Sequence, residues 1–444
     1  MAKEALSPFK NRSTTQEFLF SPAESHRVDG QGTDSGPSAD LSGRFPEMFD
    51  RQETLMAAIE AQMATATTIL VLAMDIGTAI AAAADPDGDA TTAGVAPLAR
   101  FCRTHGGIWG RIGRQRFACA LAERDGHAGA ELADDLMSHC QEAGLPPVII
   151  GWATFPTLDM TRADTVQNAR KALDHGAFFG SGSITPFDGV SLNISGDRLY
   201  QADDMAGAMA EFKKGLQLDP TDANLYNSLG VCYGILEDYP NAFAAFENAM
   251  QLSPHDVMAV YNKGYLLLRQ GQHTTALACF MEAYAHEPEI FEVVYHIGQA
   301  HMALAQADQA RPFLEAATRI NPRSGPAAAL LGRCLDDLGL TRDAIQAYKH
   351  AVKINPEDAE VLSRLGQSYR LLGESLDVAA VFCEQSVRLV PDNGQFRVAL
   401  GEVYLQLERI DEARAEFEAA ERLGCPDHPR IEAIQEGRMA AEAG

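Results

Sequence analysis

The sequence predicts two structural parts: an α+β domain in residues 51–188 and an all-α superhelical solenoid from residue 189 onward. Two observations support this prediction. Apolar runs of strand length alternate with amphipathic stretches between residues 51 and 188, and Gly, Ala and Pro recur at a 34-residue step after them. Residues 1–50 are rich in Ser, Gly, Asp and Pro and have no sustained period, so we expect a disordered tail there.

The α+β domain is predicted from the order of its segments. A helix over RQETLMAAIEAQMA precedes the buried strand TILVLAM, which the Ala-rich helix IGTAIAAAA follows, and another helix covers about 94–104. A hairpin, WGRIGRQRFACAL, follows in residues 109–121. After it we expect a helix near 127–143, the strand PPVIIGWATF, the helix RADTVQNARKALDHG and a short strand, SITPFD. Strands that alternate with helices around one hairpin predict a ferredoxin-like α+β sheet.

The C-terminal period consists of three residue types at fixed positions. They are Gly196, Gly230, Gly264, Gly298, Gly332, Gly366 and Gly401; Ala208, Ala242, Ala276, Ala310, Ala344, Ala379 and Ala413; and Pro220, Pro254, Pro288, Pro322, Pro356 and Pro391. The sixth unit contains one extra residue. This pattern resembles the tetratricopeptide repeat family, with its sequence L-G-x2-Y, A-x3-F and P.

Each 34-residue unit is expected to form two antiparallel helices. The apolar positions of the first helix are spaced i, i+3, i+4 and i+7, so they share one face. Gly at position 8 permits close approach of the second helix, and Pro at position 32 ends that helix. We therefore predict seven repeats over residues 189–427. A capping helix and tail are predicted over residues 428–444.

The segment order of the α+β domain resembles the GGDEF domain, the diguanylate cyclase fold. RIGRQRFACAL stands where that family has R-L-G-G-D-E-F-A-V-L-L, VIIGWATF matches its later strand, and ARKALDHG matches its last helix. The resemblance implies a nucleotide site with two Mg²⁺ ions held by an Asp at the end of the first strand and by acidic residues of the hairpin turn. Here the first-strand position is assigned to Ala73, with Asp75 two residues later.

The hairpin turn presents Arg114, Gln115 and Arg116 in place of the acidic residues that the resemblance requires. A turn with two added positive charges cannot hold hard cations. We therefore expect no catalytic residues, no metal and no cofactor, and the protein is predicted not to be an enzyme. Arg114 and Arg116 could instead bind an anion or a nucleotide phosphate. The alternative is a solvated turn whose charges oppose the acidic surface.

In the tetratricopeptide family, positions 2, 5, 6 and 9 of the first helix line a concave groove. Tyr and Asn at such positions combine apolar area with hydrogen bonding, which suits peptide recognition. The alternative is that the tyrosines pack between neighbouring helices. The predicted protein-binding residues are Asn224, Asn227, Tyr261, Asn262, Tyr265, Tyr295, His296, Arg333 and Arg364.

Composition excludes several classes of partner. The net charge is −25, with 61 acidic and 36 basic residues, which argues against nucleic acid and anionic membranes as partners. The eight cysteines form no C-x-x-C pair, and the N-terminus has no apolar signal-peptide core, so a cytoplasmic location is expected. The sequence thus favours a non-catalytic adaptor or scaffold that binds a protein or peptide through its repeats. The alternative is a sensor of GTP or cyclic di-GMP that signals through them.

Overall fold

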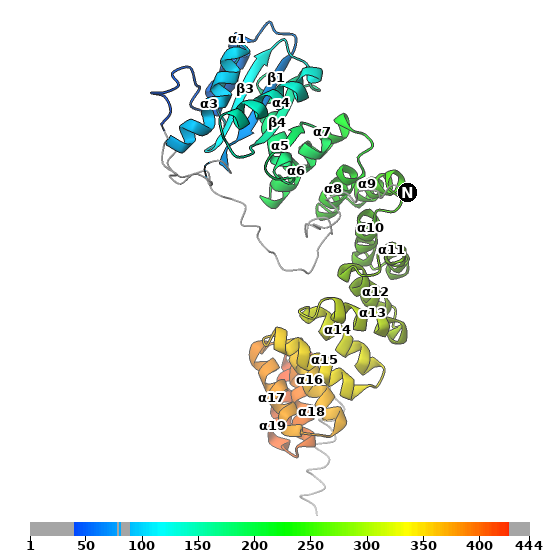
Figure 1. The fold of residues 1–444 in the computed structure, drawn as a ribbon. Coiled ribbons are helices and arrows are strands. Elements are labelled where there is room, and N and C mark those ends of the chain that lie inside the picture. Colours follow the sequence, from blue (N-terminus) through cyan, green and yellow to red (C-terminus); the bar gives the residue numbers. More distant parts are fainter. Residues whose placement is uncertain (1–39, 78–79, 81–88, 426–444) are drawn as a thin grey trace, which may run out of the picture. The chain divides into compact units, whose positions relative to one another are not determined.

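The computed structural model describes residues 40–77, 80 and 89–425. These residues divide into two compact units, one formed by residues 40–254 and the other by residues 255–425. The first unit contains a β-sheet with its helices and two helical hairpins, and the second contains five further hairpins (Figure 1). The predicted capping helix over residues 428–444 lies outside the described residues.

The sheet has five strands in the order β2-β3-β1-β4-β5. The central strand β1 pairs antiparallel with β3 and with β4, and β5 pairs parallel to β4. Burial of β1 on both faces explains why its sequence, ILVLAMD, is apolar up to the last residue. The strand bounds are β1 (Ile69–Asp75), β2 (Ile108–Arg111), β3 (Arg116–Ala122), β4 (Ile149–Phe155) and β5 (Ile184–Pro186).

Helices cover both faces of this sheet. Helices α3 (Asp89–Thr104) and α4 (Gly126–Glu142) pack on the face that carries Leu70, Leu72 and Met74. Helices α1 (Gln52–Gln62) and α5 (Asp164–Gly176) pack on the opposite face, which carries Val71 and Ala73. The helices and strands expected over residues 51–188 are therefore present in the expected order, wherever the chain is described.

The boundary of the predicted tail is wrong at its C-terminal end. Leu41 and Phe45 are buried in the core, and Phe45 packs edge-on against Trp109 with ring centroids 5.4 Å apart. The backbone of Phe49 pairs with β2, since its N–H donates to the Trp109 carbonyl at 3.1 Å. A composition average over residues 1–50 conceals these isolated apolar anchors. The remainder of the predicted tail, residues 1–39, lies outside the described residues.

The repeats form seven helical hairpins within the described residues, which confirms the tetratricopeptide solenoid. We call the first helix of each hairpin its A helix and the second its B helix. The pairs are α6 (Gly189–Gln201) with α7 (Met205–Leu218), α8 (Ala223–Ile235) with α9 (Tyr239–Leu252), α10 (Val257–Arg269) with α11 (His273–His286), α12 (Phe291–Ala303) with α13 (Ala307–Ile320), α14 (Gly325–Asp337) with α15 (Thr341–Ile354), α16 (Ala359–Leu372) with α17 (Leu376–Leu389), and α18 (Gly394–Gln406) with α19 (Ile410–Arg422).

The recurring glycines and prolines have the roles predicted for them in helix packing and helix termination. The glycine at position 8 faces a B-helix side chain in every hairpin; at Gly230, an added Cβ would lie 2.5 Å from the ring of Phe246. Each of the first six B helices ends two residues before the recurring proline, as α9 does at Leu252 before Pro254. Asp256 then caps the next A helix, α10, by accepting a hydrogen bond from the backbone N–H of Met258.

Candidate functional site

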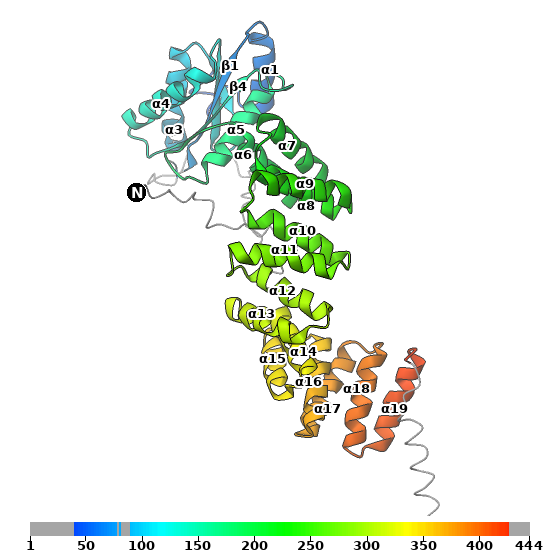
Figure 2. The same cartoon turned by 90° about the vertical axis from the view of Figure 1, so that its right-hand side faces the viewer.

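The A helices of the second unit form a continuous layer. Successive A helices contact one another directly, α10 with α12, α12 with α14, α14 with α16 and α16 with α18, and the B helices α11 to α17 each pack against their own A helix and the next (Figure 2). The elements that approach one another along one side of such a stack form its inner surface. Solenoid repeats bind their partners on this surface. The predicted groove residues from Tyr261 to Arg364 all belong to this layer.

Three of the predicted groove residues are core residues. Tyr261 and Asn262 have no exposed surface, and His296 is 4% exposed. A side chain without exposed surface cannot touch a partner, so their assignment as groove contacts is wrong and the alternative, packing between helices, holds for them. Position in the repeat gives the direction of a side chain but not the depth to which its neighbours cover it.

His296 is the centre of this buried cluster. Its Nδ1 atom lies 2.8 Å from the Glu292 carbonyl oxygen and 3.0 Å from the Tyr261 hydroxyl. Because a carbonyl only accepts, Nδ1 donates its proton to Glu292. Burial lowers the pKa of His296 to about 4, against the opposing effect of this hydrogen bond, and burial raises the pKa of Tyr261 well above its usual value. The imidazole is therefore neutral in the folded protein near pH 7.

Tyr265 and Tyr295 lie next to this cluster, and their side chains are only half-buried. Both rings pack edge-on against His296, at centroid distances of 5.3 and 5.0 Å. Tyr295 also stacks on Phe291 at 5.8 Å. These contacts fix the two tyrosines while leaving part of each ring accessible. Rigid, partly exposed aromatic rings of this kind are common anchors for protein partners.

Two arginines extend the same surface. Arg333 on α14 is half-buried, and it makes no ion pair with any residue that the structure describes. Its charge acts on Tyr295, whose pKa is raised by burial and lowered in part by Arg333. Arg364 on α16 pairs with Glu360 at 2.7 Å across one helical turn. We call Tyr265, Tyr295, Arg333 and Arg364 the A-helix face.

The remaining two predicted groove residues lie in the other unit. Asn224 is exposed and Asn227 is buried, and both belong to α8. Beside them, the Ser228 hydroxyl donates to Oδ1 of Asn193 on α6 at 3.1 Å. Asn227 therefore contributes little accessible surface, so its assignment as a groove contact is wrong for the same reason as that of Tyr261.

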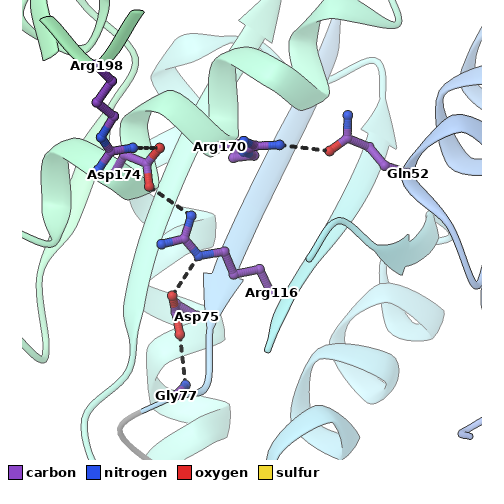
Figure 3. A network of polar contacts seen from close by, with 7 residues as sticks. All are labelled: Gln52, Asp75, Gly77, Arg116, Arg170, Asp174 and Arg198. Carbon is purple, nitrogen blue, oxygen red and sulfur yellow. Dashed lines mark hydrogen bonds and ion pairs between the residues drawn. The ribbon is translucent and has the colours of Figure 1, made fainter. Parts of the chain in front are cut away.

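The second region of interest is a chain of charges around Arg116. Its Nε lies 2.8 Å from Oδ2 of Asp75, and its Nη1 lies 2.8 Å from Oδ1 of Asp174 (Figure 3). Asp174 also pairs, through its other oxygen, with Arg198. Burial lowers the pKa of Arg116, but Asp174 and Asp75 outweigh burial and raise it. Two carboxylates thus already neutralise Arg116, and its predicted anion binding stays a prediction. Arg114 is exposed, and its predicted anion binding stays a prediction.

Ala73 and Asp75 of β1 differ in their surroundings. Ala73 lies inside β1, fully buried and paired with Ala118, whereas Asp75 ends the strand opposite Arg116. An acidic residue is therefore present at the end of β1, two residues after Ala73. Within the described ranges, no group of three or more His, Cys, Asp and Glu side chains could hold a metal ion.

Helix α5 connects the sheet to the first repeat. We did not predict this connection from the sequence. One face of α5 packs on the sheet through Val166, Ala169 and Leu173. Its other face pairs with both helices of the first hairpin: Lys171 with Glu211, Asp174 with Arg198, and His175 with Asp188 at 3.4 Å.

A family model for the cilia and flagella-associated protein 70 C-terminal domain matches residues 166–442. The chain belongs to this family of tetratricopeptide repeat proteins. The match begins inside α5 and not at the first hairpin, in agreement with the contacts of α5 described above. No curated protein matches the chain.

Solved tetratricopeptide structures are also similar to this chain. The C-terminal part of a repeat-containing protein from Cytophaga hutchinsonii is 16% identical, covering 54% of this chain and 98% of that one, with a TM-score of 0.43. PilF of Pseudomonas aeruginosa is 20% identical, covering 46% and 92%, with a TM-score of 0.42. YrrB, described as having an unusual peptide-binding site, is 20% identical, covering 45% and 97%, with a TM-score of 0.39. Among the described residues, no helix is long and apolar enough to span a bilayer.

Proposed function

We propose that the protein is a non-catalytic adaptor that binds another protein through the A-helix face. The observation that supports this most strongly is the combination of two fixed, half-buried tyrosines with the guanidinium of Arg333, which no described residue neutralises. On a chain with a net charge of −25, a positive group beside two tyrosines favours an acidic partner. A tetratricopeptide fold suits a protein or peptide partner.

The chemistry of this face defines the partner. The rings of Tyr265 and Tyr295 offer apolar area, and Arg333 offers positive charge along the same layer, while the charge of Arg364 is shared with Glu360. A peptide with an aromatic or aliphatic anchor followed by a carboxylate would complement both. Electrostatic attraction of this kind speeds association and sets specificity, and it weakens as salt is added.

A peptide library displayed on phage and selected against the full chain tests this proposal. We expect the enriched peptides to pair an apolar anchor with an acidic group. Tyr295→Ala and Arg333→Glu should each weaken their binding by roughly tenfold or more. Arg319→Glu is the matched control, since Arg319 is an exposed arginine on the B helix α13. Selected peptides that bind Arg333→Glu as tightly as the unaltered chain would contradict the proposal.

The α+β domain is proposed to be GGDEF-like in architecture without diguanylate cyclase activity. The hairpin between β2 and β3, which carries RIGRQRF beside the end of β1, supports the likeness. The ion pairs of Arg116 argue against both catalysis and a nucleotide sensor at that turn. Purified protein incubated with GTP and Mg²⁺ should form no cyclic di-GMP above a blank. A cytoplasmic location is part of the proposal, supported by the widely spaced cysteines of the sequence.

A further inference from the structure

Arg116 occupies the point where two acidic side chains from different elements converge. Asp75 reaches it from the end of β1 and Asp174 from α5, and each places a carboxylate oxygen 2.8 Å from one of its nitrogens (Figure 3). Asp174 is 9% exposed and Asp75 21% exposed in their side chains. Two poorly solvated carboxylates that face one another repel strongly unless a cation lies between them.

The residues around this point do not fit a Mg²⁺ ion. Mg²⁺ requires oxygen ligands at about 2.0–2.1 Å in octahedral geometry, with no positive group among them. Here a guanidinium lies between the two carboxylates and already satisfies one oxygen of each. Its planar fork supplies charge and two directed hydrogen bonds, which a spherical ion does not.

The charges also balance along the chain of contacts. Asp75, Arg116, Asp174 and Arg198 alternate in sign, and they run from the sheet through α5 to α6 of the first repeat. Gly77 fixes the first of these, because its N–H donates to Oδ1 of Asp75 at 2.8 Å. Arg116 thus belongs to a continuous polar connection between the hairpin and the repeats.

We propose that Arg116 is a built-in cation that stands in the place of a bound divalent ion, holding Asp75 and Asp174 together and thereby joining the sheet to the first repeat. This role is independent of the partner proposed for the A-helix face. It predicts how the site responds when the guanidinium is removed. Removal of the guanidinium leaves Oδ2 of Asp75 and Oδ1 of Asp174, whose Oδ2 stays paired with Arg198, for a divalent cation to bridge.

Mn²⁺ is a suitable probe, because its binding to the full chain is read directly by electron paramagnetic resonance and indirectly by the melting temperature. Arg116→Ala should bind Mn²⁺ at least tenfold more tightly than the unaltered chain does, and MnCl2 should raise its melting temperature. Arg114→Ala is the matched control, since it removes the same charge from an exposed position two residues away. It should show neither effect.

Two further variants keep the test decisive. Arg116→Ala with Asp75→Asn should lose the gained Mn²⁺ binding, because one carboxylate of the pair is gone. Arg116→Gln keeps the length of the side chain without its charge, and it provides the same readout if Arg116→Ala folds poorly. If neither neutral variant binds Mn²⁺ more tightly than the unaltered chain, or if Arg114→Ala gains as much, the proposal is overturned.

Discussion

Nε of Arg116 on β3 lies 2.8 Å from Oδ2 of Asp75, its neighbour in register at the end of β1. Asp75 and Asp174 together neutralise this arginine inside the domain, beside the turn between β2 and β3. Arg116 thus links the hairpin to α5 inside the domain, whereas Arg333 of the A-helix face has no such ion pair with a described residue.

Substitution of the two stacked tyrosines of α10 should separate core from surface. Tyr261→Ala removes a fully buried ring and should lower the free energy of unfolding by about 3–5 kcal/mol. Tyr265→Ala should cost less, because its ring is half-buried. Chemical denaturation followed by circular dichroism measures both. Equal costs for the two variants would mean that Tyr265 is also a core residue and not part of a binding face.

The buried imidazole of His296 should make the stability of the compact unit of residues 255–425 sensitive to acid. Its pKa is lowered from 6.5 to about 4, so the unfolded chain takes up a proton in this range that the folded protein does not. Stability from this group is complete above about pH 6.5 and is lost as the pH falls toward 4, by up to about 3 kcal/mol.

His296→Gln isolates this effect, because glutamine does not titrate. Thermal unfolding of both proteins between pH 7 and pH 4 should show a smaller decrease for the variant. The comparison between proteins removes the contribution of carboxyl groups such as Asp336, whose pKa is raised by burial and which they share. Parallel curves for the two proteins would show that His296 is protonated as readily in the folded state as in the unfolded state.

The repeat glycines should tolerate no side chain where the two helices of a hairpin meet. A Cβ at Gly264 would lie 2.9 Å from Cβ of Cys279 and from the ring of Phe280. Gly264→Ala should therefore destabilise the protein by about 1–3 kcal/mol, despite the better helix propensity of alanine. Gly325→Ala is the matched control, since its nearest neighbour would be 3.6 Å away. A stabilising Gly264→Ala would show that the hairpin is looser than the structure has it.

The sequence predicted the repeats well because their period repeats one local geometry. Each glycine, alanine and proline marks a contact or a turn within a single hairpin, so spacing alone located the helices. The depth of Tyr261 could not be read in the same way, since it depends on Phe280 and His296, which come from the following helices.

The charge network could not be predicted because its members are distant in the chain. Arg116 is 41 residues from Asp75 and 58 from Asp174, and only the sheet register and the packing of α5 bring them together. Sequence alone showed a turn with two positive charges and gave no sign that one of them is neutralised. The packing of α5 against α6 likewise depends on which face of α5 the sheet leaves uncovered.

The central claim, that a protein partner occupies the A-helix face, is tested most directly by site-specific photo-crosslinking in the native cell. A benzophenone side chain at position 295, on the face, is compared with one at position 319, on the B helix α13. The account predicts a discrete crosslinked protein from position 295 that Arg333→Glu abolishes, and none from position 319. Crosslinking of the same protein from position 319 alone, or equally from both positions, would contradict it.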